Sequence, residues 1–182
     1  MKDFILEVRK IIPSNVCKKI ISYYNEESMS SAKIVSGEDK TIRNCQIKHI
    51  QHPDSFGKKL INNYINKVVW TICDEYIKKH GHFNYSKITQ LDFLKYEKNN
   101  FDTGYKYHVD FGETCSQRHL SISINLNNDF TGGEFVFDLK EGQVQYPQNE
   151  GDAIAFPSNF MFPHQVNSIK SGTRYALIAW VI

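Results

Sequence analysis

Two side chains that can bind a metal stand two residues apart in the run Tyr105-Lys-Tyr-His-Val-Asp110. The run is rich in β-forming residues, and side chains alternate between the faces of a strand, so His108 and Asp110 are expected to point the same way. A third donor from a distant strand would complete the set, and His164 is the candidate. Two histidines and one carboxylate occupy one face of an octahedron, which suits Fe(II) that must also hold a cosubstrate and O2.

An arginine follows His164 by ten residues. On the predicted last strand, Arg174 shares one face with Ala176, Ile178 and Trp180, so a guanidinium stands among apolar neighbours. If Arg174 and His164 both point inward, Arg174 can form a two-pronged salt bridge with a carboxylate whose other end chelates the metal. 2-Oxoglutarate has that shape.

The elements that must position these residues change in character along the chain. The first part predicts a strand, a helix, a polar loop, a second strand and a longer helix that is capped by the turn 52–55 and ends near Gly81. The predicted bounds of the first four are Phe4–Ile12, Ser14 or Asn15 to about Glu27, Ser28–Lys40 and Thr41–Ile50.

From Ile88 onward, short β-rich runs broken by Gly, Asn and Pro indicate packed antiparallel strands. Turns are expected at 127–129, 131–133 and 149–152. The fold class is therefore α+β and mainly β: a double-stranded β-helix, or jelly roll, buttressed by two N-terminal helices. The predicted strands are Ile88–Tyr96, Tyr105–Asp110, His119–Leu126, Gly133–Leu139, Gln143–Tyr146, Ala153–Phe156, His164–Val166 and Thr173–Val181.

The run His119–Leu126 alternates between apolar residues and the small polar residues Ser121, Ser123 and Asn125. Its polar face either meets solvent or lines a polar cavity inside the jelly roll. The alternation alone is compatible with both arrangements.

Length and composition favour one domain. The 182 residues, 41% hydrophobic and 23% charged, suffice for a single core. We expect one domain over 1–182, with N-terminal strands and supporting helices in 1–87 and the jelly-roll core with the metal site in 88–182. A net charge of +2 produces no long-range field that would favour nucleic acid or an anionic membrane.

The cysteines and the N-terminal residues indicate a compartment. The four cysteines form no C-x-x-C pair, so reduced thiols are expected. An early acidic residue and the lack of a long apolar run argue against a signal peptide and a transmembrane helix. We therefore expect a cytoplasmic protein, and the abundance of Asn, Lys and Ile suggests an A/T-rich microbe or virus as its source.

Residues 88–182 resemble the Fe(II)- and 2-oxoglutarate-dependent dioxygenases, specifically the prolyl 4-hydroxylase group with its collagen-type and oxygen-sensing members. The matching pieces follow one another in the family's order. They are Tyr96, Thr103–Asp110, Ile124–Asn127, Gly132–Glu134, Pro147, Gly151–Phe156, His164–Val166 and Gly172–Trp180.

The resemblance implies a role for each matching residue. His108, Asp110 and His164 would be iron ligands, and Arg174 would bind the C5 carboxylate of 2-oxoglutarate. The remaining candidates divide into cosubstrate and substrate contacts: Tyr96, Trp180 and Asn125 for the first, Arg118 and Tyr105 for the second. Arg174 replaces the lysine of collagen-type enzymes and matches the oxygen-sensing type.

Two positions depart from the family's pattern. Asn125 stands where the family often has a tyrosine that contacts the cosubstrate, and Ile178 where some members have threonine. A few extra residues also separate Tyr96 from His108. Asn125 and Ile178 bear on the affinity for 2-oxoglutarate, and the extra residues bear on the role of Tyr96.

The reaction implied is hydroxylation of an unactivated C–H bond, most simply in a peptidyl proline, with release of succinate and CO2 and with ascorbate as the reductant. The expected partners are O2 and a peptide or protein, without nucleic acid or membrane; the sequence leaves the oligomeric state open. Lysyl residues, free amino acids and nucleobases are alternative substrates, and a zinc hydrolase and a non-catalytic jelly-roll binding module are remoter alternatives. The segments Ser28–Lys40 and Glu97–Thr103 are expected to form a mobile rim over the metal.

Overall fold

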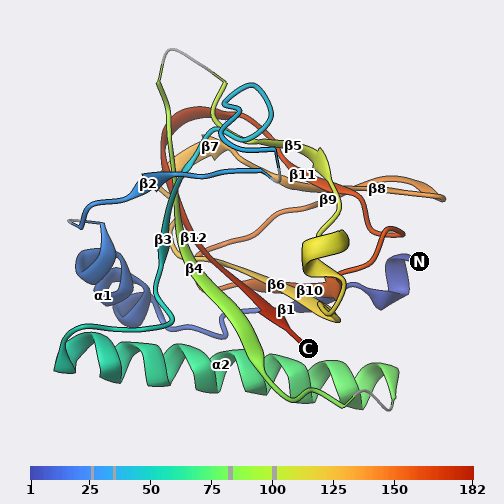
Figure 1. The fold of residues 1–182 in the computed structure, drawn as a ribbon, viewed down its shortest axis with the longest axis horizontal. Helices are drawn as coiled ribbons and strands as arrows, with labels where there is room; N and C mark the ends of the chain where they lie inside the picture. The colour runs from blue at the N-terminus through green and yellow to red at the C-terminus, as the bar shows by residue number, and fades with distance from the viewer. Residues whose placement is uncertain (26, 35, 82–83, 100–101) are drawn as a thin grey trace.

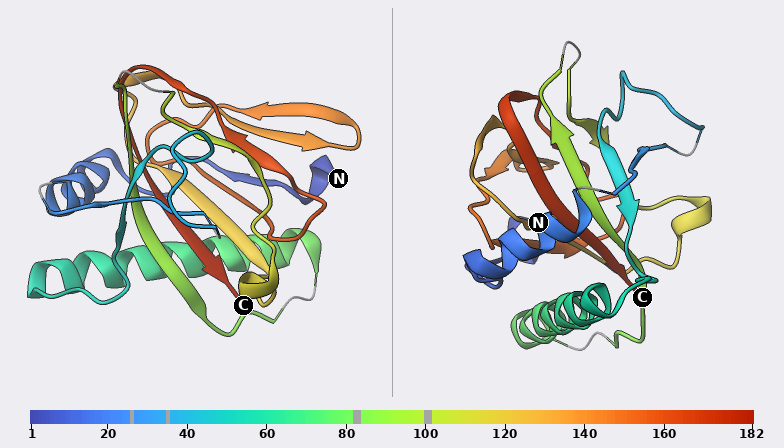
Figure 2. Two further views of the ribbon diagram at one scale, coloured as in Figure 1. Left: turned by 45° about the horizontal axis from the view of Figure 1, so that its top comes forward. Right: turned by 90° about the vertical axis from the view of Figure 1, so that its left-hand side faces the viewer.

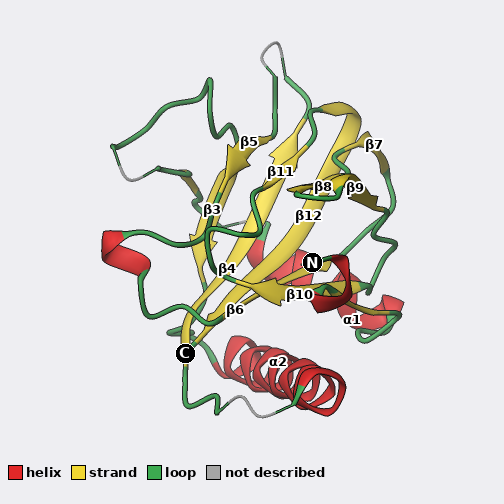
Figure 3. Cartoon of the chain, turned by 90° about the vertical axis from the view of Figure 1, so that its right-hand side faces the viewer, coloured by secondary structure: helices red, strands yellow, loops and turns green. Residues whose placement is uncertain are grey.

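Two facing antiparallel sheets and two covering helices make up the fold (Figure 1). The computed structural model describes residues 1–25, 27–34, 36–81, 84–99 and 102–182. Both helices lie on one side of the larger sheet, and the smaller sheet lies on its other side (Figures 2 and 3). The predicted helix-buttressed jelly roll is confirmed.

The larger sheet is built around the long final strand. All its pairs are antiparallel, and β7 (Phe130–Gly132) also pairs with the start of that strand. Strands from the first 87 residues extend both edges of the sheet, so the N-terminal segments and the jelly-roll strands share one layer. In spatial order the strands are β1 (Leu6–Val8), β10 (Ala153–Pro157), β6 (Leu120–Asn125), β12 (Ile169–Val181), β4 (Ile88–Glu97), β3 (Gln46–His49) and β2 (Ser30–Ser31).

The smaller sheet holds both histidines of the predicted metal site. Its strands are also antiparallel, and the two strands that carry these histidines lie side by side. In spatial order they are β5 (Tyr105–His108), β11 (His164–Val166), β8 (Phe135–Leu139) and β9 (Gly142–Tyr146).

The helices begin and end near the predicted signals. In α2 (Phe56–His80), the Ser55 side chain accepts a hydrogen bond from the backbone of Lys58, and the helix stops at Gly81, whose φ of 92° favours glycine. The shorter α1 (Ser14–Tyr24) starts after Pro13 without a side-chain cap, so the predicted Ser14 or Asn15 cap is wrong. Short 3-10 helices, η1 (Lys2–Phe4) and η2 (Glu113–Cys115), complete the helical elements of the described chain.

Two separate apolar cores hold these layers together. One lies between the helices and the larger sheet and takes Leu177, Ala179 and Val181 from β12. The other lies between the two sheets and takes Ile178 and Trp180 from the same strand. The alternation predicted for the last strand is therefore confirmed.

Several predicted strands are shorter in the structure. Only Leu6–Val8 of the first is a strand, because the chain before it turns as a 3-10 helix. Only Gln46–His49 of the second is a strand, because the amides of Thr41 and Arg43 bond back to Asp39 in a turn. The first helix ends at Tyr24 rather than near Glu27, and residue 26 lies outside the described residues. Part of the predicted turn 131–133 is strand β7. Within the described chain, no helix is both long and apolar enough to cross a membrane.

Candidate active site

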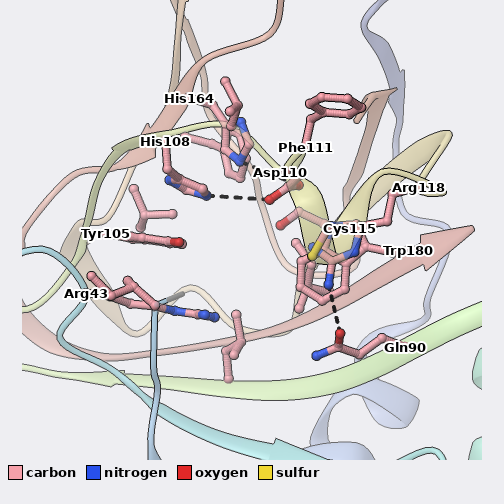
Figure 4. Close-up of a pocket in the computed structure, with 18 of the residues that line it drawn as sticks. Arg43, Gln90, Tyr105, His108, Asp110, Phe111, Cys115, Arg118, His164 and Trp180 are labelled. Atoms are coloured by element: carbon pink, nitrogen blue, oxygen red, sulfur yellow. Dashed lines mark hydrogen bonds and ion pairs between the residues drawn. The ribbon is translucent and has the colours of Figure 1, made fainter. Parts of the chain in front are cut away.

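The structure brings together the two histidines and the aspartate singled out by spacing (Figure 4). His108 ends β5 and pairs directly with His164, which begins β11. Asp110 lies just beyond the end of β5 rather than within it. Its Oδ1 is 3.7 Å from Nε2 of His108, and its Oδ2 is 3.8 Å from Nε2 of His164. The ligand atoms of all three lie within 4.8 Å of one another, so one metal ion can bind all three.

Backbone carbonyls fix the orientation of both imidazoles. Nδ1 of His108 lies 2.8 Å from the carbonyl of Lys106, and Nδ1 of His164 lies 2.9 Å from that of Phe162. A carbonyl only accepts, so each Nδ1 carries the proton and each Nε2 presents a lone pair to the cluster. Burial lowers the pKa of His108 to about 3, and the repulsion that two protonated imidazoles, His108 and His164, would exert on each other adds to this effect. His108 is therefore neutral and able to ligate a metal.

The carboxylate of Asp110 is held by Ser121, which in turn contacts Ser158. Ser121 Oγ donates to Asp110 Oδ2 at 2.6 Å and lies 2.7 Å from Ser158 Oγ. Burial raises the pKa of Asp110, but His164, His108 and the Ser121 hydrogen bond lower it more, and the net shift is downward. Ser121, Ser123 and Asn125 are all buried, so the polar face of β6 points into the interior.

A cavity of about 240 Å³ opens beside this cluster, between the two sheets. Three of the predicted cosubstrate residues line it: Tyr96, Arg174 and Trp180. Tyr96 and Arg174 are cross-strand partners on β4 and β12, which places them next to each other. The donor set and the predicted cosubstrate residues therefore share one enclosed space.

Arg174 is a buried cation without a carboxylate partner among the described residues. Only 2% of its surface is exposed, and burial lowers the pKa of its guanidinium. Its neighbours are the amide oxygen of Gln148, 3.1 Å from Nη2, and the ring of Tyr96, 5.4 Å from Cζ. A buried charge is costly without a counter-charge. The site therefore favours an anionic ligand next to Arg174, which fits 2-oxoglutarate.

A glycine makes room for this arginine. Gly133 has a φ of 68°, and a Cβ there would lie 3.1 Å from Cδ of Arg174 and 2.5 Å from Cδ1 of Ile169. A larger residue would displace both side chains. The segment Gly132–Glu134, one of the pieces that match the family, thus leaves space for the Arg174 side chain.

Asn125 is not among the residues that line the cavity. Its Nδ2 donates to the carbonyls of Asn127 at 2.6 Å and Gln148 at 3.1 Å. Gln148 in turn donates from Nε2 to the carbonyl of Ser123. Asn125 therefore holds the segment that carries Gln148, while Ile178 does line the cavity.

The two predicted substrate residues lie on opposite sides of the metal cluster (Figure 4). The ring of Tyr105 stacks on that of His108, with centroids 3.4 Å apart. The guanidinium of Arg118 lies over the ring of Trp180 at 3.9 Å and donates to Oε1 of Gln90 at 2.9 Å. Both residues line the cavity.

Three residues near the site were missed from the sequence: Arg43, Gln90 and Gln148. Arg43 and Gln90 lie within segments whose periodicity indicated only strands, and Gln148 lies between the predicted strand Gln143–Tyr146 and the predicted turn 149–152. A single polar residue in such a segment carries no spacing signal. Their positions depend on how distant segments pack.

A jelly roll with a His/Asp/His cluster and an unpaired buried arginine in one cavity defines a metal-dependent oxygenase class of site. The sequence profile of the 2OG-Fe(II) oxygenase superfamily matches residues 91–182, which include all four of these residues. The chain belongs to this superfamily, whose members use Fe(II) and 2-oxoglutarate.

Similar proteins include a group of bacterial hydroxylases. A PKHD-type hydroxylase of Acaryochloris marina is 34% identical over 97 residues, which cover 52% of this chain and 42% of that protein. A PKHD-type hydroxylase of Idiomarina loihiensis is 23% identical over 182 residues, which cover 97% of this chain and 77% of that protein. The chain thus matches less than half the length of the Acaryochloris relative.

Solved structures of prolyl hydroxylases share the fold. That of a Trichoplax adhaerens prolyl hydroxylase, in complex with a hypoxia inducible factor peptide fragment, has a TM-score of 0.84 at 17% identity and covers 99% of this chain and 84% of its own. A Pseudomonas putida prolyl-4-hydroxylase has a TM-score of 0.76 at 18% identity, over 98% of this chain and 92% of its own.

Proposed function

We propose that this protein is a 2-oxoglutarate-dependent dioxygenase that hydroxylates an unactivated C–H bond, with a peptidyl proline as substrate and succinate and CO2 as coproducts. One observation carries the proposal: the His108, Asp110 and His164 cluster and the unpaired guanidinium of Arg174 face the same cavity. That arrangement suits a ligand that chelates a metal at one end and carries a carboxylate at the other.

Each residue has a distinct task in this proposal. His108, Asp110 and His164 hold Fe(II), and Ser121 keeps the aspartate in its ligating orientation. Arg174 binds the C5 carboxylate of 2-oxoglutarate. Bound iron supplies the oxidation of a C–H bond by O2, coupled to decarboxylation of the cosubstrate.

The remaining side chains shape the rest of the cavity. Tyr96, buried with its pKa raised chiefly by desolvation, offers a neutral hydroxyl donor to the same carboxylate. Trp180 flanks the cosubstrate. Tyr105 and Arg118 line the cavity on either side of the metal cluster, where they would contact a bound peptide.

A proline substrate is supported by the proteins that this chain resembles in fold and in sequence. Its fold is that of proteins described as prolyl hydroxylases, one of them solved with a peptide fragment, and its relatives carry the name PKHD-type hydroxylase. The metal-binding strand, the Gly-Gly-Glu turn and the final arginine strand follow the same order in the prolyl hydroxylase pattern.

Mass spectrometry of a proline-rich peptide panel incubated with Fe(II), 2-oxoglutarate and ascorbate tests the proposal. We expect a mass gain of one oxygen, on proline, that disappears without 2-oxoglutarate and in His164→Ala. The panel includes lysyl peptides, free amino acids and nucleobases, so hydroxylation of one of these alone would replace proline as the substrate.

The same reactions test the other classes. Omitting ascorbate shows whether it serves as the reductant, through a loss of activity over repeated turnovers. Turnover supported by Zn(II) in place of Fe(II), without O2 consumption, would indicate a hydrolase. Peptide binding that is independent of any metal, with no product, would indicate a binding module.

A further inference from the structure

The cavity beside the metal cluster carries more positive charge than the proposed reaction uses. Its lining includes Lys33, Arg43, Arg118 and Arg174, while Asp110 is the only carboxylate among the described lining residues. None of the three arginines forms a salt bridge with another described residue. Such an excess inside a partly enclosed space is unfavourable unless a ligand compensates it.

The cofactor and cosubstrate leave most of this excess in place. The two charges of Fe(II) and the charge of Arg174 are balanced by Asp110 and the two carboxylates of 2-oxoglutarate. Arg43 and Arg118 stay without a counter-charge, with Lys33 at the exposed rim. The group that compensates them must therefore come from a further ligand. O2 is neutral, so the substrate is the molecule of this reaction that can supply it.

Of the two arginines, Arg43 is the one with a buried donor that lacks a partner, although its guanidinium also lies within hydrogen-bonding reach of the Cys45 thiol. Arg118 already donates to Gln90 and lies flat over Trp180, so its guanidinium is held in place. Arg43 donates from Nη1 to the carbonyl of Lys33 at 3.1 Å, while its Nε is buried without a hydrogen-bond partner. A cation with an unsatisfied donor is stabilised by a nearby hydrogen-bond acceptor, above all by a charged one.

Arg43 also lies at the right depth. Its Cζ is 4.6 Å from the ring centroid of Tyr105, and that ring stacks on the imidazole of His108. The guanidinium is thus separated from the metal cluster by one aromatic ring, and it enters the cavity from the side opposite Arg118 (Figure 4). A substrate group bound to Arg43 would therefore lie close to the substrate carbon that is hydroxylated at the metal.

We infer that the substrate is anionic: it carries a carboxylate that Arg43 binds while the C–H bond to be hydroxylated lies at the metal. This inference rests on the proposed function. In a peptide, the carboxylate belongs to an Asp or Glu within a few residues of the hydroxylated proline. The same recognition would serve a free carboxylic acid, and the experiment separates the two sources.

The test is isothermal titration of peptides into protein loaded with Mn(II) and 2-oxoglutarate, so that no turnover occurs. Each peptide contains one proline flanked by Asp, by its isostere Asn, or by Lys. We expect the Asp peptides to bind roughly tenfold or more tightly than the Asn peptides, as one charge-assisted hydrogen bond allows. Arg43→Gln should abolish this preference, whereas Arg43→Glu should favour the Lys peptides.

Matched variants keep the result interpretable. Arg43→Lys retains the charge and should retain part of the preference, so it reports on charge even if Arg43→Gln folds poorly. Lys19→Gln removes an exposed cation of α1 and should change nothing. Affinity for 2-oxoglutarate should be equal in the wild type and in Arg43→Lys, which keeps the charge, because Arg174 binds the cosubstrate.

The outcomes separate this inference from the proposed function. Equal binding of Asp and Asn peptides, unchanged in Arg43→Gln, would overturn the inference and leave a peptidyl proline substrate intact. If no peptide binds but free carboxylic acids do, and Arg43→Gln weakens them, the peptide substrate is wrong and the inference stands. If the free carboxylic acids bind equally well to the wild type and to Arg43→Gln, the inference is overturned.

Discussion

Both faces of the larger sheet bury apolar residues, but on β6 and β12 the buried polar and charged residues lie on the face toward the smaller sheet. On β12, Leu177, Ala179 and Val181 pack against the helices, while Arg174 and Trp180 face the smaller sheet. On β6, Ile122 and Ile124 belong to the helix side, while Ser121, Ser123 and Asn125 are buried on the other. Burial is equally complete on both faces.

The difference shows how this fold divides its tasks. The helix-facing core is apolar and contributes stability through burial of hydrocarbon. The face toward the smaller sheet buries a carboxylate and a guanidinium, and these charges cost stability unless a metal or an anion completes their interactions. Substitutions on the first face should therefore act on folding, and substitutions on the second on ligand binding.

Loss of a metal ligand should have the largest effect. We expect His164→Ala, His108→Ala or Asp110→Ala to abolish iron binding and turnover, because the site has only three protein donors. Iron binding is measured by titrating Fe(II) into the protein without O2 and determining the metal content after desalting. Wild-type metal affinity in all three variants would remove the basis for the site.

A core truncation should give the reverse pattern. Leu177→Ala, on the helix side of β12, should lower the free energy of unfolding by about 2–5 kcal/mol. Below the denaturation transition its iron stoichiometry should be that of the wild type. Chemical denaturation measures the first quantity, and a folded variant that no longer binds iron would break the division between the two faces.

A conservative change of the buried cation should weaken one ligand selectively. Arg174→Lys cannot reproduce a planar two-pronged contact, so 2-oxoglutarate should bind about 1–3 kcal/mol more weakly while iron affinity stays constant. Titration of 2-oxoglutarate into the anaerobic Fe(II) protein, followed by its visible charge-transfer band, provides the measurement. Equal affinity in the two proteins counts against the role of Arg174.

A smaller effect is expected at Gln148, whose amide oxygen accepts from Arg174 and whose amide nitrogen donates to Ser123. Gln148→Ala should free the guanidinium to move and weaken 2-oxoglutarate by about 0.5–1.5 kcal/mol, the value of one hydrogen bond. The exposed Gln145→Ala on β9 is the control. If both variants bind alike, Gln148 does not position the arginine.

The smallest change expected is in the dynamics of the rim. Lys33 and Ile34 of the segment Ser28–Lys40 line the cavity, whereas residues 35, 100 and 101 of the two predicted rim segments lie outside the described residues. We expect hydrogen exchange in Ser28–Lys40 and Glu97–Thr103 to slow when an accepted peptide binds. If hydrogen exchange in both segments is unchanged while the peptide is demonstrably bound, the prediction of a mobile rim is wrong.

Local spacing was enough to identify the centre of the site. The alternation along 173–181 is a property of a strand wherever it lies, so the sequence predicted which side chains share a face. The two-residue interval of His108 and Asp110 identified the right pair, although Asp110 lies just beyond the strand. The order of the later motifs then indicated the family, which the sequence profile bears out.

Packing decided what spacing leaves open. The polar side of β6 faces inward because a second sheet covers it, and Arg43 reaches the cavity because it pairs with Tyr105 in an isolated β-bridge. Gln148 meets Arg174 across a separation of 26 residues. Contacts of this kind depend on how distant segments come together, and alternation within one strand carries no information about them.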